Sequence, residues 1–88
     1  MSREKLRDNL VQAYHSGKQI AIYQGGCVWL GRVVALMVLS PSGLVSGITL
    51  GYQGVYGGMI WHKEFLLGEW PSWRLCGRVY GEYTREIR

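Results

Sequence analysis

The segment from Lys18 to Leu39, KQIAIYQGGCVWLGRVVALMVL, constrains the fold more than any other part of the chain. Ile20 and Ile22 alternate with smaller or more polar neighbours, which is the period of two typical of a half-buried strand. Gly25 and Gly26 supply the positive φ angles that a tight hairpin turn requires. We therefore expect two antiparallel strands on either side of this turn, at residues 18–24 and 27–39.

The second strand, from Cys27 to Leu39, is apolar at nearly every position. A strand that carries apolar side chains on both faces is covered on both faces. We expect one face to meet the core and the other to be covered by the N-terminal helix or by a second subunit. Gly31 lies where a long strand must bend to serve two sides of a small barrel.

Residues 3–16 have the pattern of an amphipathic helix. Leu6 and Leu10 fall on one side of the helical wheel, and charged residues occupy the rest. Ser2 is a suitable N-cap and Gly17 a suitable left-handed residue at the C-terminal end. We expect this helix to lie across a sheet or across one open end of a barrel.

The remainder of the chain alternates strand patterns with turns rich in glycine and proline. The expected elements are a turn at 40–43, a strand at 44–52, a hairpin connection at 53–58, a strand at 59–62, a helical turn at 64–67 and a strand at 74–84. A helix followed by five strongly bent strands in meander order is the plan of Sm-like and SH3-like barrels. We therefore predict a mainly β (α+β) fold, one domain over residues 1–88, with the barrel at 18–84.

The composition of the chain excludes some classes of function but does not indicate a particular one. Ten Lys and Arg against six Asp and Glu give a net charge of +4, which permits an anionic partner without requiring one. Cys27 and Cys76 form no metal or redox motif, so we expect free thiols, no metal and no cofactor. The N-terminus is charged, and the longest apolar run, Val33 to Leu39, is too short to span a bilayer. We expect a cytoplasmic protein without a membrane partner.

Catalytic chemistry has little support in the sequence. Neither cysteine has a neighbouring base that would activate it as a nucleophile. Glu64 and Glu69 belong to an irregular segment, where a solvated surface explains them better than acid–base catalysis. We therefore predict a protein that is not an enzyme and has no catalytic residues.

The tryptophans around the irregular segment leave three interpretations open. Trp61, Trp70 and Trp73 can close the open end of the barrel, or they can anchor a protein interface, where Trp, Tyr and Arg dominate binding energy. In the third interpretation an exposed aromatic ring stacks on nucleic-acid bases. The positive rim of such a platform would come from Lys63, Arg74 and Arg78.

Two segments carry a resemblance to a known family. The stretch LVQAYHSGKQIAIYQGGCVWLGRV resembles the first motif of the bacterial Sm-like RNA chaperones of the Hfq family, and MIWHK at 59–63 resembles their second motif. The match covers roughly residues 10–31 and 59–63. The resemblance implies a ring of subunits joined by their edge strands. It also implies that Trp61, His62 and Lys63 lie at the pore of this ring, where they meet phosphates and base edges.

Our leading hypothesis is a small RNA-binding or nucleic-acid-associated regulatory protein that forms a homo-oligomer. Its expected contact residues are Trp61, His62, Lys63, Arg74 and Arg78. The alternative is a protein-binding adaptor or inhibitor, such as a phage- or plasmid-type factor, that docks a partner through an aromatic surface.

Overall fold

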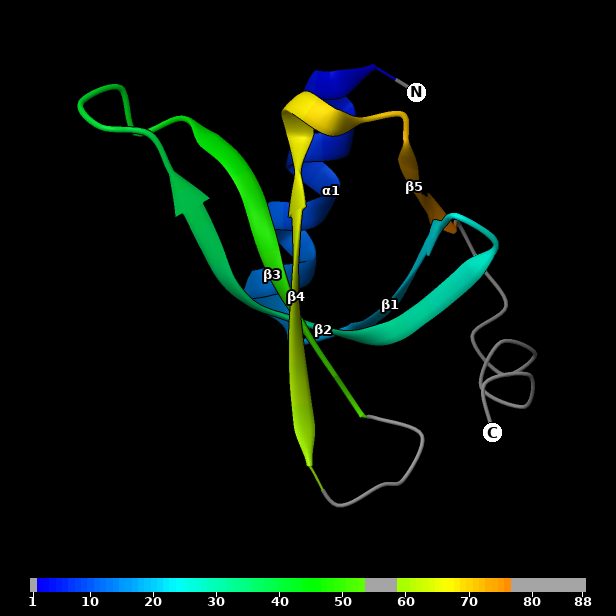
Figure 1. Ribbon diagram of the computed structural model, residues 1–88. Coiled ribbons are helices and arrows are strands. Elements are labelled where there is room, and N and C mark those ends of the chain that lie inside the picture. Colours follow the sequence, from blue (N-terminus) through cyan, green and yellow to red (C-terminus); the bar gives the residue numbers. More distant parts are fainter. Residues whose placement is uncertain (1, 54–58, 77–88) are drawn as a thin grey trace.

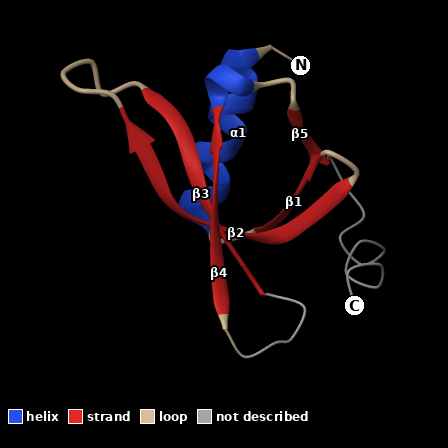
Figure 2. Ribbon diagram, in the orientation of Figure 1, coloured by secondary structure: helices blue, strands red, loops and turns tan. Residues whose placement is uncertain are grey.

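The computed structural model describes residues 2–53 and 59–76 of the chain. In this part, one helix precedes the strands, in agreement with the predicted mainly β class. The elements are α1 (Arg3–Ser16), β1 (Gln19–Gln24), β2 (Cys27–Val38), β3 (Val45–Gln53), β4 (Ile60–Leu66), the 3₁₀ helix η1 (Leu67–Glu69) and β5 (Trp73–Cys76) (Figures 1 and 2). The prediction of one domain over 1–88 extends beyond the described residues.

Helix α1 begins and ends where the sequence predicts. The Ser2 hydroxyl accepts a hydrogen bond from the backbone N–H of Lys5 at 3.1 Å, which satisfies one of the free amides of the first turn. Gly17 has a left-handed φ of 68°, and its N–H donates to the carbonyl of Ala13 at 3.0 Å. Both predicted caps are therefore confirmed.

The β1–β2 hairpin is also confirmed. Gly25 and Gly26 have φ angles of 58° and 82°, and Gln24 pairs with Cys27 across the turn. Positive φ at both central residues gives a turn whose twist matches that of the paired strands. The turn therefore sets the register of the whole hairpin, from Gln24 and Cys27 to Gln19 and Arg32.

The described strands form one antiparallel sheet in the order β4-β3-β2-β1-β5. The expected meander holds for β1 to β4, and β5 pairs with β1, the neighbour that closure of a barrel gives to its last strand. No ladder joins β4 to β5 within the described residues, so the sheet is not closed into the expected barrel there. Side chains link the two edges instead. The Trp73 indole N–H donates to the Leu66 carbonyl at 2.9 Å, and the Trp73 ring centroid lies 5.5 Å from that of Phe65.

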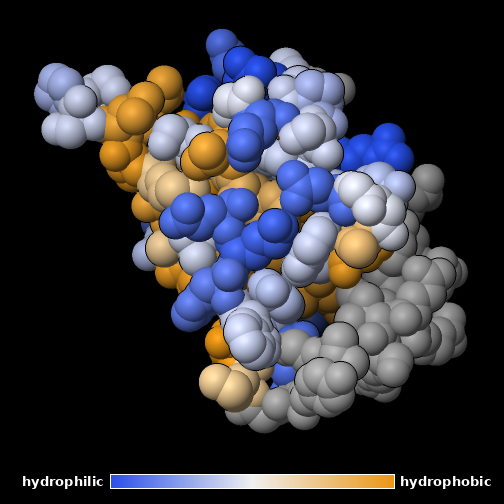
Figure 3. Space-filling view, viewed as in Figure 1, coloured by the Kyte–Doolittle hydropathy of each residue, from blue (hydrophilic) through white to orange (hydrophobic). Residues whose placement is uncertain are grey.

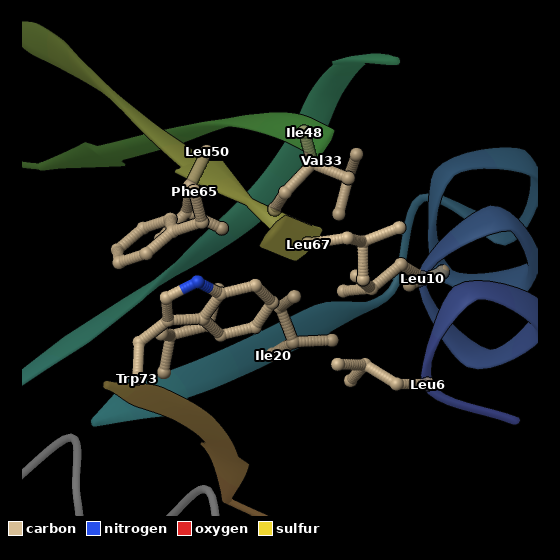
Figure 4. Packing of buried hydrophobic residues seen from close by; sticks show 11 residues of the cluster. Leu6, Leu10, Ile20, Val33, Ile48, Leu50, Phe65, Leu67 and Trp73 are labelled. Atoms are coloured by element: carbon tan, nitrogen blue, oxygen red, sulfur yellow. The ribbon is translucent and has the colours of Figure 1, made fainter. Parts of the chain in front are cut away.

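The core lies on the inside of this curled sheet, where α1 packs against it (Figure 4). Leu6 and Leu10 of the helix point toward Ile20 and Leu67, while Phe65 and Trp73 fill the part further from the helix. The buried cluster consists of Leu6, Leu10, Ala13, Ile20, Ile22, Val33, Ile48, Leu50, Phe65, Leu67 and Trp73. Every strand and the helix contribute to it, so the core forms only when the whole sheet curls.

The predicted cover on the second face of β2 is not provided by the helix. Helix α1 packs in the same cluster as Val33, which is the core side of β2. Val34, which packs over Gly51 on the opposite side of the sheet, keeps 45% of its surface exposed. The expectation that the helix covers this side is therefore wrong, because the narrow apolar stripe of α1 is used up by the core. Cover by a second subunit stays a prediction.

The pairing of β2 with β3 is in register at Gly31 and becomes irregular further along the strand. The pairing with β3 shifts register between Val33 and Ala35, which marks a bulge. At Gly31 the two strands instead approach so closely that an added Cβ would lie 2.1 Å from the carbonyl oxygen of Gly51. Gly31 therefore permits a close approach of the two backbones, and the irregular pairing lies beyond it, between Val33 and Ala35.

The segment after β3 differs from its prediction. The helical turn expected at 64–67 is wrong, since Glu64 and Phe65 continue β4 by pairing with β3. The only helical turn in this stretch is η1, which begins at Leu67. Cross-strand pairing overrides the weak local preference of KEFLLG here. The connection at 54–58 and the predicted fifth strand beyond Cys76 lie outside the described residues.

Candidate nucleic-acid interface

The strand pairings sort the side chains into two faces, because residues directly opposite each other in a ladder point to the same side of the sheet. The inner face contains the core residues. It also carries Trp29, Tyr52, Trp61 and Lys63, according to the registers of β1 with β2, β2 with β3 and β3 with β4. The outer face carries Arg32, Val34, Gly51, Ile60, His62, Glu64 and Leu66.

Along β4, the side chains on the inner face change from buried to exposed. Phe65 and its partner Ile48 are buried, and Leu50, the partner of Lys63, is buried as well. One row further along, Trp61 pairs with Tyr52 and leaves 52% of its surface exposed. The inner face thus continues beyond the buried core with exposed aromatic side chains.

Lys63 is the charged residue of this inner row. Its ammonium nitrogen lies 4.9 Å from the centroid of the Trp29 ring and 5.5 Å from that of Phe65. The two rings meet edge to face, with centroids 5.9 Å apart. A cation over an aromatic face is attracted by the negative potential of the ring, while the lysine stem covers apolar surface. The aromatic cluster therefore provides a favourable position for the ammonium group.

We call Trp29, Tyr52, Trp61 and Lys63 the aromatic rim. Its three rings come from β2, β3 and β4, and its cation comes from β4. Flat aromatic faces beside a positive charge suit a planar ring attached to an anionic group, which is the chemistry of a nucleotide. The rim therefore offers both a stacking surface and a phosphate partner.

The structure brings only part of the predicted contact set to this rim. Trp61 and Lys63 lie on the inner face, two residues apart on one strand. His62 between them is exposed on the outer face, next to the backbone of Gly51. Consecutive residues of a strand point to opposite sides, so the three cannot act as one cluster on a single face.

Arg74 occupies a separate position. It lies on β5, where it pairs with Tyr23 of β1, and its guanidinium carbon is 5.0 Å from the centroid of the Tyr23 ring. Both side chains are exposed on the outer face, at the edge of the sheet opposite to β4. Arg78 lies outside the described residues. Arg74 thus forms a second cation–aromatic pair, apart from the rim.

Sequence reasoning missed two members of the rim. The predicted contact set contains neither Trp29 nor Tyr52. Trp29 does pack against the buried cluster, yet it is half-buried and faces Lys63. The alternation pattern places Trp29 on the same side of the sheet as Val33. Only the registers of β2 with β3 and of β3 with β4 show that Lys63 lies on this side as well.

The described part of the chain contains no candidate metal centre. Within residues 2–53 and 59–76, no three His, Cys, Asp or Glu side chains gather where they would hold a metal ion. Cys27 and Cys76 are free thiols. None of the described helices has the length and hydropathy needed to cross a bilayer.

The chain was compared with known protein families, with curated proteins and with solved structures, and none of them matches it. The aromatic rim is therefore the main guide to function.

Proposed function

We propose that this protein is a small, non-catalytic RNA-binding or nucleic-acid-associated regulator that binds its ligand at the aromatic rim. The observation that carries the proposal is the position of Lys63, whose ammonium lies 4.9 Å over Trp29 on the face that also exposes Trp61. A stacking ring and a cation two residues apart on one strand lie on the same face of the sheet, where one ligand can contact both.

The energetics favour single-stranded nucleic acid over duplex. Stacking on an exposed aromatic side chain contributes about 1–3 kcal/mol per base, and a base is available for stacking only where it is unpaired. In a duplex both faces of each base are already stacked on neighbours. Trp61, half exposed at the rim, offers its ring to an unpaired base, and Lys63 supplies the charge for the adjoining phosphate.

The other described residues of the predicted set lie on the outer face rather than at the rim. His62 lies on the outer face of the same strand, and Arg74 lies on β5 at the far edge. The net charge of +4 adds a weak, long-range attraction for the phosphate backbone.

An oligonucleotide titration at two salt concentrations tests the proposal. We expect a fluorescently labelled single-stranded RNA to bind, with an affinity that falls as salt rises because counterions are released. Lys63→Met removes one phosphate contact, so the slope of log K against log salt decreases by about 0.7. Lys18→Met removes the same charge from an exposed position away from the rim and should leave most of the slope intact. Absence of salt-dependent binding to the unaltered protein would refute the function.

A second candidate function, a protein-binding adaptor or inhibitor, is favoured by one specific feature. The β2–β3 arm (residues 37–45) extends away from the rest of the molecule (Figure 1), and apolar side chains gather at its base (Figure 3). Val38, Leu39 and Leu44 of this arm are 55%, 51% and 46% exposed. Capture of one stoichiometric partner, lost when Leu39 and Leu44 become serine, would support this function over nucleic-acid binding.

We also propose a homo-oligomer in the cytoplasm. Strands β4 and β5 are the two edges of the sheet in the described residues, and exposed strand edges tend to pair with other chains. The free thiols of Cys27 and Cys76 fit a reducing compartment. Light scattering checks the first proposal, since a strict monomer at all concentrations would contradict it. Cell fractionation checks the second.

A further inference from the structure

One aromatic face of the rim is already occupied by the protein itself. The Lys63 ammonium lies over the Trp29 ring, at 4.9 Å from its centroid. A base that stacks on this face needs the same space. Trp29 is therefore closed to a ligand while Lys63 stays in place, although its ring is half-buried rather than fully enclosed.

We propose that Lys63 is a displaceable cover over a base-stacking face of Trp29. A nucleotide phosphate draws the ammonium away from the ring, and the base of that nucleotide takes its place. This inference rests on the proposed function and adds a regulation of the same site: the phosphate opens the position in which the base is held.

The physical basis is a competition for one ammonium group. A cation–aromatic contact is worth about 2- to 30-fold in an equilibrium constant. A charge-assisted hydrogen bond to a phosphate is stronger than a neutral one and competes well with that contact. The lysine side chain is flexible, so its head can move by rotation about its own bonds while its strand stays paired with β3.

The second ring under Lys63 explains why the exposed face belongs to Trp29. Phe65 is buried, and its other neighbour is Trp73, with ring centroids 5.5 Å apart. A ligand cannot reach Phe65 without opening the core. Departure of Lys63 therefore exposes Trp29, on the same inner face that carries Trp61.

The cover makes recognition depend on a base and a phosphate together. A nucleoside lacks the anion that draws Lys63 away, so it must displace the ammonium without compensation. A nucleotide supplies the anion and gains the stacking face in one step. The unaltered protein should therefore bind adenosine 5′-monophosphate more tightly than adenosine.

The test uses these two probes with the Lys63→Met variant of the full chain, which keeps an apolar stem but has no charge. Titrations are followed by the Trp29 indole N–H signal in NMR spectra. We expect Lys63→Met to bind adenosine about 2- to 30-fold more tightly than the unaltered protein, because the cover has been weakened. Its preference for the monophosphate should disappear. Lys18→Met, an exposed lysine outside the rim, should change neither affinity.

The outcomes separate this inference from the proposed function. If a folded Lys63→Met protein binds adenosine with unchanged affinity, the proposal that Lys63 covers Trp29 is overturned. Binding of tetramethylammonium but not adenosine to this variant would also overturn it, since the face would then suit a cation from a protein partner. Lys63→Gln serves as a second variant if Lys63→Met fails to fold. Failure of RNA binding in the unaltered protein refutes the function, whereas the adenosine comparison tests the cover on its own.

Discussion

Two neighbouring residues of β4 show how differently the two faces of the sheet are used. Phe65 and Leu66 are adjacent and both apolar, yet Phe65 is 1% exposed on the inner face and Leu66 is 39% exposed on the outer face. The curl of the sheet, rather than the residue type, decides which of them is buried. The inner face therefore forms both the core and the aromatic rim, while the outer face retains apolar side chains in contact with solvent.

The glycines of the sheet repeat this contrast. A Cβ on Gly31 would meet the backbone carbonyl of Gly51 at 2.1 Å. A Cβ on Gly51 would instead meet the end of the Val34 side chain at 2.8 Å, and Val34 is partly exposed and can rotate. The close approach on the inner face involves backbone atoms and is rigid. The one on the outer face involves a side chain, which can move. Stability should therefore be far more sensitive to changes on the inner face.

The largest expected effect is on the core. Phe65→Ala removes a ring that packs against both Trp29 and Trp73, and we expect a loss of about 3–5 kcal/mol in the free energy of unfolding. Leu66→Ala, one residue along, should cost about 1 kcal/mol. Urea unfolding followed by circular dichroism measures both. Phe65→Leu provides a milder variant if Phe65→Ala does not fold. Equal losses at the two positions would contradict the assignment of the two faces.

The glycine pair gives an intermediate effect. Gly31→Ala forces the backbones of β2 and β3 apart, so we expect a loss of about 1–3 kcal/mol. Gly51→Ala should cost less than about 1 kcal/mol, because Val34 can move aside. Thermal unfolding of the two variants under the same conditions makes the comparison. A larger loss for Gly51→Ala would show that the outer face is the rigid one.

The smallest effect concerns the contact between the helix and the β2–β3 arm. The Arg7 Nε donates to the carbonyl of Val45 at 2.9 Å, beyond the point where β4 ends. We expect Arg7→Met to cost about 1 kcal/mol through loss of this hydrogen bond. Arg3 makes a longer contact, 3.4 Å, to the Trp70 carbonyl, and Arg3→Met should have no measurable effect in the same denaturant titrations. Equal losses in the free energy of unfolding for the two variants would contradict a specific stabilising contact between Arg7 and the arm.

Local signals in the sequence predicted the first half of the fold well. The caps Ser2 and Gly17 and the pair Gly25–Gly26 each act through their own backbone geometry, so neighbouring residues were enough to place α1 and the first hairpin. The pairing of β5 with β1 could not be obtained this way. It depends on Trp73 entering the core beside Phe65, a contact between residues in different elements.

The candidate site was predicted only in part for a related reason. Alternation shows that Trp61 and Lys63 share a face, but it does not show whether that face is the inner one. The proximity of Trp29 to Lys63 follows from the registers of three strands and from the curl of the sheet. Arg74 and Lys63 looked equivalent as cations near tryptophans, whereas the fold puts them on opposite faces.

The most direct measurement of the central claim, that the rim of the inner face holds the ligand, compares two adjacent exposed residues of β4. Trp61 and Ile60 are 52% and 62% exposed and point to opposite faces. In fluorescence anisotropy with a labelled single-stranded RNA, we expect Trp61→Ala to weaken binding about 5- to 150-fold and Ile60→Ala to leave it unchanged. Equal weakening by both substitutions, or a loss confined to Ile60→Ala, would contradict binding at the inner rim.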